Sequence, residues 1–285
     1  MAAFTSEEII QATGARLLKP AASVSFSDVC TDTRAIAKGS LFVAFKGTSF
    51  NGHDFVDKAL AAGAAGAVVS EVRPEYEGLT APIFVAADTL KAYQDLARFH
   101  RRRFAIPVVA VTGSVGKTST RNMIATVLSE KYRVLQTEKN FNNEIGLPKT
   151  LLQLTPDHEA CVVEMGMRGL GQIAELAAIG EPTIGVVTNV GKSHIELLGS
   201  QENIAKAKAE LVQALDEKGT AVLNGDDPFV RPMTALCKGK TVLYGTDDQA
   251  AVRADHIVCD QQGVRFHCSG AGQSFDVSVP VIGGH

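Results

Sequence analysis

The sequence predicts an α/β protein of two domains, a small one over residues 1–104 and a larger one over residues 105–285. Its length of 285 residues exceeds that of a typical single domain. Hydrophobic residues make up 45% of the chain and charged residues 21%, so sizeable cores can form. Short apolar runs alternate with helical stretches, a pattern typical of a mostly parallel sheet covered by helices on both faces.

The first domain is predicted from short apolar runs of strand character at 41–45, 66–71 and 82–87. One helical stretch, at 53–63, lies between the first two runs, and another, at 88–101, follows the third. Strands and helices that alternate over such short distances predict a small α/β unit.

The second domain is predicted from a longer alternation of the same kind. Apolar strands are expected at 107–113, 159–166, 182–191 and 219–227, with helices at 117–130, 170–180 and 200–216. Beyond residue 240 the strands are short and separated by turns, so we expect that part to be antiparallel. No helix follows the final VPVIGGH, so we expect the domain to be truncated at its C-terminal end.

Composition and charge disfavour several classes of protein. The net charge of −3 gives no general attraction to nucleic acid or acidic lipid. The basic run 101–103 ends a predicted helix, and we expect it to be a solvated face. The chain begins with no signal peptide and has no apolar stretch of about 18 residues, so we expect no membrane partner. The scattered cysteines include no C-x-x-C pair, which indicates a reducing cytoplasm.

The stretch VTGSVGKTST, at 111–120, predicts a phosphate-binding loop. An apolar strand leads into a glycine turn and a helix, whose N-terminus favours an anion. Lys117 would reach the terminal phosphates, and Thr118 would offer its hydroxyl to Mg²⁺. The glycines are closer together than in the usual G-x-x-x-x-G-K loop, and a simple glycine turn with a solvated lysine is the alternative. The expected nucleotide contacts are Gly113, Ser114, Val115, Gly116, Lys117, Thr118 and Ser119.

Polar side chains follow three of the predicted strands. Glu164 ends one apolar run, and its carboxylate is the kind of ligand that Mg²⁺ prefers. Asn189 ends the next strand and His194 follows it, whereas Asn224 and Asp227 follow the third. Each alone is only a polar loop residue. Because the carboxyl ends of parallel strands meet at one edge of a sheet, together they predict a metal–phosphate site there.

One lysine falls on an apolar stripe of the predicted helix 200–216. Ile204, Leu211 and Leu215 share this stripe, and Lys208 follows Ile204 by four residues. A buried lysine is unfavourable unless it is paired or chemically altered. The alternative is a side chain whose stem is covered and whose ammonium reaches water. Helix geometry alone leaves both interpretations open.

Several longer stretches resemble the Mur ligases, the ATP-dependent amide-forming enzymes of peptidoglycan synthesis. The short loop TGSVGKTS resembles that family's own loop. Further segments that resemble the family lie at 140–152, 162–176, 188–211 and 223–228. The segment 32–64 is similar to the uridine-nucleotide domain of two members. The final GGH resembles a motif late in the central domain, which implies that the family's Rossmann-like C-terminal domain is absent.

The resemblance implies an ADP-forming ligase that is monomeric and acts through an acyl phosphate. EMGMRGLGQIAEL together with HIELLGS is most similar to the branch that joins D-Ala-D-Ala to UDP-N-acetylmuramoyl-tripeptide. One alternative is a sister branch that adds a diamino acid to the UDP-linked dipeptide. Another is a nucleotide-binding module without ligase activity. A P-loop kinase or GTPase is disfavoured, because the loop is short and the guanine-reading N-K-x-D motif is absent.

The resemblance also assigns roles to single residues. Mg²⁺ would be held by Thr118 and Glu164, with His194 at a second metal site beside a carbamylated Lys208. Catalytic positions are Lys117, Lys208, His194, Glu164, Asn142 and Asn143. Adenine and ribose would lie near Asn224 and Asp227. Positions around the uridine diphosphate are Asp32, Thr33, Arg34, Lys46, Gly47 and His53. Asn51 stands where the family often has Asp.

Overall fold

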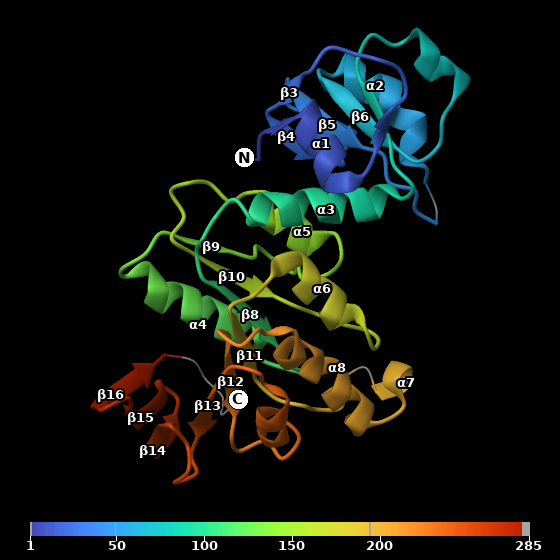
Figure 1. Cartoon of the computed structure of the whole chain (residues 1–285). Coiled ribbons are helices and arrows are strands. Elements are labelled where there is room, and N and C mark those ends of the chain that lie inside the picture. Colours follow the sequence, from blue (N-terminus) through green and yellow to red (C-terminus); the bar gives the residue numbers. More distant parts are fainter. Residues whose placement is uncertain (1, 49, 194, 281–285) are drawn as a thin grey trace. The chain divides into compact units, whose positions relative to one another are not determined.

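The computed structural model describes residues 2–48, 50–193 and 195–280 of the chain (Figure 1). Two compact units are distinguished by their internal contacts. The first comprises the chain up to Ala105 together with Glu144–Asp157. The second comprises Ile106–Asn143 and the chain from His158 onward. The segment 144–157 belongs to the first unit because its helix α5 (Gly146–Leu151) packs against α3 (Thr89–Arg101).

The first unit is built on a mostly parallel sheet with the strand order β2-β7-β6-β5-β4. These strands are β2 (Arg16–Leu17), β4 (Asp28–Cys30), β5 (Ser40–Val43), β6 (Gly66–Val69) and β7 (Ile83–Val85). Of them, β2 runs antiparallel to its neighbour β7. A short antiparallel pair and two further helices accompany the sheet: β1 (Phe4–Thr5), β3 (Ser25–Phe26), α1 (Ser6–Thr13) and α2 (Val56–Ala61).

The predicted strands and helices of the first unit are confirmed, with differences at short elements. The segment Gly52–Phe55 forms a 3-10 turn before α2, so that helix is shorter than predicted. The sequence interpretation missed β4 and α1. A three-residue strand is too short to show a clear periodic pattern, and α1 buries only Ser6 and Ile9 of its own residues.

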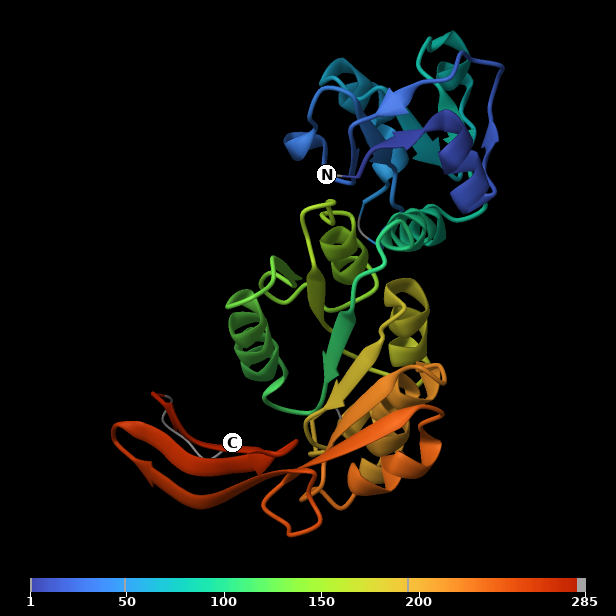
Figure 2. The same cartoon turned by 60° about the vertical axis from the view of Figure 1, so that its left-hand side comes forward.

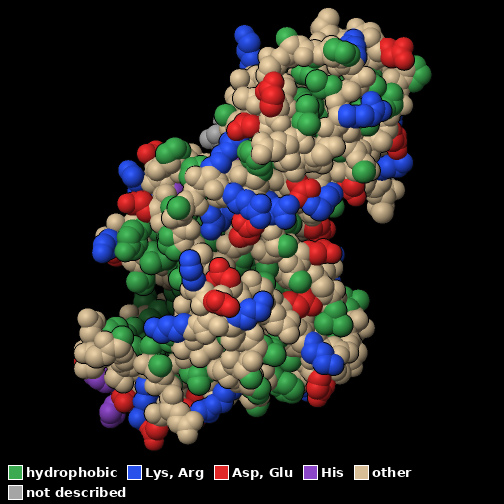
Figure 3. Space-filling model, in the orientation of Figure 1, with side chains coloured by type: hydrophobic (Ala, Val, Ile, Leu, Met, Phe, Trp, Pro, Cys, Tyr) green, Lys and Arg blue, Asp and Glu red, His purple; other side chains and the backbone are tan. Residues whose placement is uncertain are grey.

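The basic run at the end of α3 is only partly a solvated face. Figure 3 shows Lys and Arg side chains gathered over α3. Arg101, however, is 7% exposed and donates a hydrogen bond to the Phe104 carbonyl at 2.7 Å. The Arg103 guanidinium lies 4.7 Å from the centroid of the Phe4 ring and pairs with Glu8 at 2.8 Å. The expectation of a solvated face is therefore wrong for Arg101, whose buried side chain bonds to the backbone of the first unit.

The second unit contains a larger sheet with the described order β16-β15-β14-β13-β12-β11-β8-β10-β9. Its parallel part consists of β8 (Val108–Thr112), β9 (Val134–Gln136), β10 (Ala160–Glu164), β11 (Ile184–Val187), β12 (Thr220–Asn224) and β13 (Lys240–Gly245). An antiparallel extension, red in Figures 1 and 2, consists of β14 (Val252–Asp260), β15 (Gly263–Gly270) and β16 (Gln273–Val279).

Helices cover both faces of the parallel part. On one face lies α4 (Lys117–Ser129), and on the other lie α6 (Gln172–Gly180) and α8 (Gln201–Ala214), as Figure 2 shows. The short α7 (Ile195–Leu198) precedes α8. Every residue of β8 and β10 is buried, as expected for strands covered on both sides. The predicted strands and helices of this part are confirmed.

Two expectations about the second unit are wrong in detail. The strand β13 pairs parallel to β12, and β14 to β16 have nine, eight and seven residues, so this region is neither wholly antiparallel nor made of short strands. Most side chains of β16 are exposed, so the apolar runs that reveal buried strands are missing there. On α4, the apolar residues Met123 and Val127 are 44% and 71% exposed. Instead Arg121 and Ala125 are buried.

The strand order makes the carboxyl end of β8 a switch point of the sheet. From β8 the chain passes to β9 and β10 on one side, and then to β11 on the other side of β8. In open α/β sheets a crevice forms at such a point, between loops that lead in opposite directions. The residues that follow β8, β10 and β11 are therefore brought to one place.

A pH-dependent contribution to the stability of the first unit is predicted from His100. Its Nε2–H donates to the Leu154 carbonyl at 2.9 Å, and its Nδ1 accepts from Arg103 at 3.3 Å, which fixes a neutral ring. Burial lowers the pKa of His100 from 6.5 to about 4. The unfolded chain therefore binds more protons between these pH values, and stability falls as the pH is lowered from 6.5 towards 4.

The loss from this group should reach about 3 kcal/mol over that interval. Urea unfolding of wild type and His100→Gln at several pH values measures it, because the variant should lack this part of the pH dependence. His256→Gln is the matched control, since the His256 side chain is 86% exposed. Parallel pH profiles for wild type and His100→Gln would contradict the assignment.

Candidate functional site

A glycine turn joins β8 to the N-terminus of α4. Gly113 has no room for a side chain, since a Cβ atom there would lie 1.9 Å from the Oγ1 atom of Thr188. Gly116 has a φ of +76° and is the N-terminal cap of α4, a conformation that other residues rarely adopt. The turn thus places backbone at a helix N-terminus with no side chain at Gly113 or Gly116, which is the arrangement that binds an anion such as phosphate.

The turn is held by the residues that follow β11. The amide of Asn189 makes two hydrogen bonds to the backbone of Val115, accepting from its N–H at 3.0 Å and donating to its carbonyl at 3.1 Å. Thr188 Oγ1 donates to the same carbonyl at 2.9 Å, and the Ser114 N–H donates to the Asn189 carbonyl at 3.0 Å. The sequence interpretation missed Thr188, although it is a polar residue directly after a buried apolar strand.

The side chain of Lys117 bends back over this turn. Its Nζ donates to the carbonyls of Gly113 at 2.9 Å and Ser114 at 3.3 Å. Burial lowers the pKa of Lys117 from its usual value, and the nearby Glu164 carboxylate opposes that shift. The ammonium therefore lies beside the loop at the position where it can neutralise a bound anion.

The Glu164 carboxylate is buried at the end of β10 and fully hydrogen-bonded. Its Oε2 accepts from Thr118 Oγ1 at 2.8 Å and from Arg121 at 3.3 Å, and its Oε1 accepts from Asn142 at 2.7 Å. Glu164 is 2% exposed. The structure thus brings together Glu164 and Thr118, the pair predicted from sequence to hold Mg²⁺. Arg121 was missed, because an arginine on a helix usually indicates a solvated face.

The chemistry of these donors fits a magnesium ion. A carboxylate and a hydroxyl oxygen lie within hydrogen-bonding distance of each other beside the phosphate-type turn. Within the described part of the chain, no three His, Cys, Asp or Glu side chains form a metal-binding cluster. Mg²⁺ commonly takes one or two protein ligands and completes its shell with phosphate oxygens and water, so the sparse donor set suits it. His194 lies outside the described residues.

Lys208 lies on the buried stripe of α8 beside Ile204 and Leu211. It is 3% exposed, so the interpretation in which its ammonium reaches water is excluded. Burial and the charge of Lys117 lower the pKa of Lys208 to about 7. Lys206 on the same helix is exposed. Lys208 is thus a buried amine of which a substantial fraction is neutral at physiological pH.

The remaining predicted residues of the second unit have structural partners. Asn224 donates to the Thr188 carbonyl at 2.9 Å, which ties the end of β12 to the segment that holds the turn. Asp227 accepts from the N–H groups of Val190 at 2.8 Å and Phe229 at 2.8 Å. Asn142 contacts Glu164, as described above, whereas Asn143 is exposed.

The predicted uridine-diphosphate positions of the first unit follow its parallel strands β4 and β5. After β4, Asp32 and Arg34 form an ion pair at 2.6 Å, with side chains 44% and 84% exposed. The hydrogen bond from Arg34 lowers the pKa of Asp32 to about 2. Thr33 is half-buried in the 3-10 turn Thr33–Ala35. After β5, Lys46 Nζ pairs with Glu71 at 2.5 Å.

His53 differs from the other predicted residues of this group. It is 2% exposed, its Nδ1–H donates to Asn51 at 2.7 Å, and its Nε2 accepts from the Ser70 N–H at 2.8 Å. Asn51 also donates to Glu71 at 3.4 Å, and the backbone of Gly47 bonds to the same loop. With both ring nitrogens engaged, the His53 side chain holds the loop and does not reach out to a ligand. Its predicted position around the uridine diphosphate stays a prediction.

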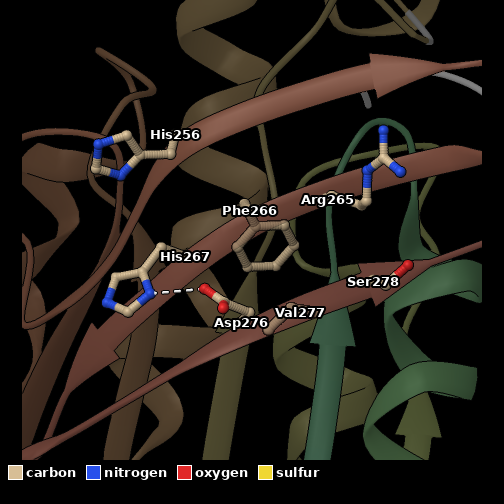
Figure 4. A pocket seen from close by; sticks show the side chains of 7 residues that line it. All are labelled: His256, Arg265, Phe266, His267, Asp276, Val277 and Ser278. Carbon is tan, nitrogen blue, oxygen red and sulfur yellow. Dashed lines mark hydrogen bonds and ion pairs between the residues drawn. The ribbon is translucent and has the colours of Figure 1, made fainter.

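A hollow of about 530 Å³ lies on the antiparallel strands β14 to β16 (Figure 4). In it, His267 pairs with Asp276 at 2.9 Å, and Arg265 pairs with Asp260 at 2.5 Å. The side chains of His256 and Asp276 are 86% and 91% exposed. Its charged groups are paired and open to solvent, whereas the groups at the switch point are buried and converge. The switch point is the better candidate site.

Fold and site together define a class of protein: a parallel α/β sheet with a phosphate-type turn and a buried carboxylate at its switch point. The sequence pattern of the Mur ligase middle domain matches residues 111–285, and that of the Mur ligase family catalytic domain matches residues 25–101. A Synechocystis protein named UDP-N-acetylmuramoyl-tripeptide–D-alanyl-D-alanine ligase is 48% identical over 241 residues, which are 83% of this chain and 53% of that protein. The chain belongs to the Mur ligase family, which confirms the resemblance seen in its sequence.

Solved structures agree with this assignment. MurF from Acinetobacter baumannii superposes with a TM-score of 0.91 at 28% identity, over 99% of this chain and 62% of that one. MurF ligase from Thermotoga maritima, solved in complex with ADP, gives a TM-score of 0.79 at 30% identity, over 88% of this chain and 57% of that one. The chain spans about half the length of the curated relatives it matches. None of its described helices has the length and apolar character needed to cross a membrane.

The close approach of Gly113 to Thr188 predicts a specific pattern of stability. Gly113→Ala should lower the free energy of unfolding by about 1–3 kcal/mol, because the new Cβ forces the turn or Thr188 to move. Thr188→Ala removes the Oγ1 atom of closest approach. The double variant should therefore lose less than the sum of the single losses.

Urea unfolding of the four proteins completes this cycle. Gly169→Ala in the same unit is the control, because the nearest atom to its added Cβ is the end of the Gln172 side chain at 4.0 Å. Strictly additive losses for Gly113→Ala and Thr188→Ala would show that the two residues do not touch in the folded protein.

Proposed function

We propose that the complete gene product is a MurF-type ligase, which joins D-Ala-D-Ala to UDP-N-acetylmuramoyl-tripeptide and converts ATP to ADP. The observation that carries the proposal is the buried Glu164 carboxylate, bonded to Thr118 beside the glycine turn. The name of the Synechocystis relative supports the two substrates, and the ADP in the Thermotoga maritima structure supports the nucleotide. Such a ligase would act in the cytoplasm, where its precursors are made.

In this proposal the second unit binds Mg²⁺ and ATP. The turn from Gly113 to Ser119 holds the phosphates through backbone N–H groups, and Lys117 neutralises their charge. Thr118 and Glu164 hold the Mg²⁺ ion, which when bound supplies positive charge to the transferring phosphoryl group. Asn224 and Asp227 lie near the adenine and ribose. Their side chains already order the segment after β11, so they shape the nucleoside pocket through the backbone as well.

The reaction passes the γ-phosphoryl group of ATP to the terminal carboxylate of the UDP-linked tripeptide. The resulting acyl phosphate is attacked at its carbonyl carbon by the amine of D-Ala-D-Ala, and phosphate leaves as the amide forms. The side chains of the protein position the reactants and stabilise negative charge. Asn142 and Asn143 are placed near the peptide carboxylate, with Asn142 also fixing Glu164.

Lys208 is proposed to carry a carbamate. Carbon dioxide adds to a neutral amine, and the lowered pKa of about 7 makes neutral amine available at physiological pH. As the N–C bond forms, the nitrogen releases one proton to solvent, and the product is a carboxylate-like anion. It would stand opposite the positive charge of Lys117 and, together with His194, support a second Mg²⁺ ion. The buried position of Lys208 is unfavourable for an ammonium and is explained by this chemistry.

The first unit is proposed to bind the uridine diphosphate of the peptide substrate. Asp32, Thr33 and Arg34 follow β4, while Lys46 and Gly47 follow the neighbouring strand β5. Since these strands are parallel, both groups lie at the same edge of the sheet. Residues 1–104 would thus form the substrate domain, with the segment Glu144–Asp157 as part of the same unit, and the rest of residues 105–285 the ATP-binding domain, in a monomeric enzyme.

A second function remains for the 285 residues taken alone, namely nucleotide binding without ligation. The observation that favours it is length, because the chain spans about half of its curated relatives. The sister ligase that adds a diamino acid is less favoured, because the Synechocystis relative at 48% identity is named for D-Ala-D-Ala.

Substrate selection in the complete gene product tests the proposed function. With UDP-N-acetylmuramoyl-tripeptide and ATP, we expect ADP and an amide product with D-Ala-D-Ala, measured by coupled ADP release and mass spectrometry. Lys117→Ala should reduce the rate by about 100-fold or more, since a preorganised charge at the transferring group is lost. Lys131→Ala, just beyond the C-terminal end of α4, serves as the control. Activity with UDP-linked dipeptide and diaminopimelate or lysine, and none with D-Ala-D-Ala, would refute the proposal.

The carbamate on Lys208 predicts a signal in carbon NMR. In ¹³C-bicarbonate the wild-type chain should show one carbamate resonance from a buried site. The intensity of this resonance should grow as the pH rises through 7, because more of the Lys208 amine becomes neutral. Lys208→Arg should lack it, and Lys206→Arg should retain it, because Lys206 is an exposed lysine on the same helix. A wild-type spectrum without this resonance at pH 8 would contradict the modification.

A further inference from the structure

Arg121 is a buried cation beside the site, and neither the sequence prediction nor the proposed mechanism uses it. It lies on α4 three residues after Thr118, so both side chains point from the same face of the helix. The side chain of Arg121 is 5% exposed and that of Glu164 is 3% exposed. Buried ion pairs of this kind are costly to form, so the pair calls for an explanation.

The guanidinium of Arg121 connects three segments. It donates to Glu164 Oε2 at 3.3 Å and to the Lys139 carbonyl at 3.0 Å, and it makes two bonds to Asn122 at 2.8 and 3.1 Å. Lys139 has a φ of +50°, an unfavourable conformation for a residue with a side chain. Arg121 thereby fixes the loop that carries Asn142, the other side chain that holds Glu164.

The charges around the turn are unusual for a metal site. Burial lowers the pKa of Lys117 and the charge of Glu164 raises it, whereas burial and the charge of Lys117 both lower the pKa of Lys208. Arg121 pairs with that carboxylate directly. In the absence of ligands, and with Lys208 as the free amine, these four side chains are positive in sum, so they attract a polyphosphate anion more than an isolated divalent cation.

We propose that Arg121 is a positioning residue that neutralises the Glu164 carboxylate until nucleotide binds. The pair holds the carboxylate in place, and it disfavours a divalent cation that arrives without phosphates. When the phosphates of the nucleotide bring their negative charge, the metal is taken up together with them. This inference rests on the proposed nucleotide and magnesium site.

Binding of Mn²⁺ alone, followed by electron paramagnetic resonance on the 285-residue chain, tests the charge directly. Arg121→Gln keeps a hydrogen-bond donor and removes the cation. It should bind Mn²⁺ without nucleotide about fivefold or more tighter than wild type, because a repulsive unit charge next to Glu164 is gone. Arg121→Lys keeps the charge and should stay within about twofold of wild type. Lys131→Gln removes one charge just beyond the C-terminal end of α4 and should leave the affinity for Mn²⁺ unchanged.

The direction of this effect separates the proposed role from a merely structural one. Damage to the loop around Lys139 would weaken Mn²⁺ binding, whereas loss of the neutralising charge strengthens it. An unchanged or weaker affinity for Mn²⁺ in a folded Arg121→Gln protein would overturn the inference. The Mn²⁺ measurement needs no nucleotide, so it still tests the inference if the wild-type chain binds no ADP. A wild-type chain that binds no ADP would count against the proposed function instead.

A second comparison covers the case in which Arg121→Gln does not fold. Glu164→Gln leaves the guanidinium unpaired, and the double variant with Arg121→Gln removes both buried charges. In EDTA, Glu164→Gln should bind ADP about threefold or more tighter than the double variant, because the free cation then attracts the phosphates. Equal affinities by isothermal titration would contradict the proposal.

Discussion

The buried carboxylate of Glu164 is the group on which the candidate site depends. It ends a strand that is covered on both faces, so it is held where it could not remain charged without partners. Thr118, Asn142 and Arg121 supply those partners from a helix and a loop. The sheet fixes the position of the carboxylate, and its hydrogen bonds then fix the loop and the start of α4. Rigidity of this kind suits a site that must orient phosphates and a metal ion.

The first unit also has a buried polar side chain that holds a loop at the edge of its sheet, and there it is a histidine. His53 sits under the loop after β5 and accepts a backbone N–H from the segment after β6. Asn51 links it to Glu71, and Glu71 to Lys46. The exposed groups at this edge are thus supported by buried polar contacts beneath them. In both units the parallel strands bring such groups to one edge, and buried hydrogen bonds set their orientation.

Much of the fold could be predicted from sequence, because parallel strands buried on both faces appear as continuous apolar runs. The glycine turn, Glu164 and the inward position of Lys208 could also be recognised. Each one interrupts or ends an apolar run of a predicted strand or helix. The antiparallel strands β14 to β16 are largely exposed and gave a weak signal. Arg121 and the loop-holding contacts of His53 could not be predicted, because they depend on partners about 40 and 20 residues away in sequence, respectively, which only the fold brings together.

The central claim is that Thr118 and Glu164 hold a divalent cation next to a nucleotide bound at the Gly113 turn. Crystals of the protein grown with ADP and Mn²⁺ test it most directly, through the anomalous signal of manganese. The account predicts one strong peak within coordination distance of the Thr118 hydroxyl, next to the Glu164 carboxylate, with the diphosphate at the turn. A peak at another location, or a nucleotide bound away from the turn, would contradict it.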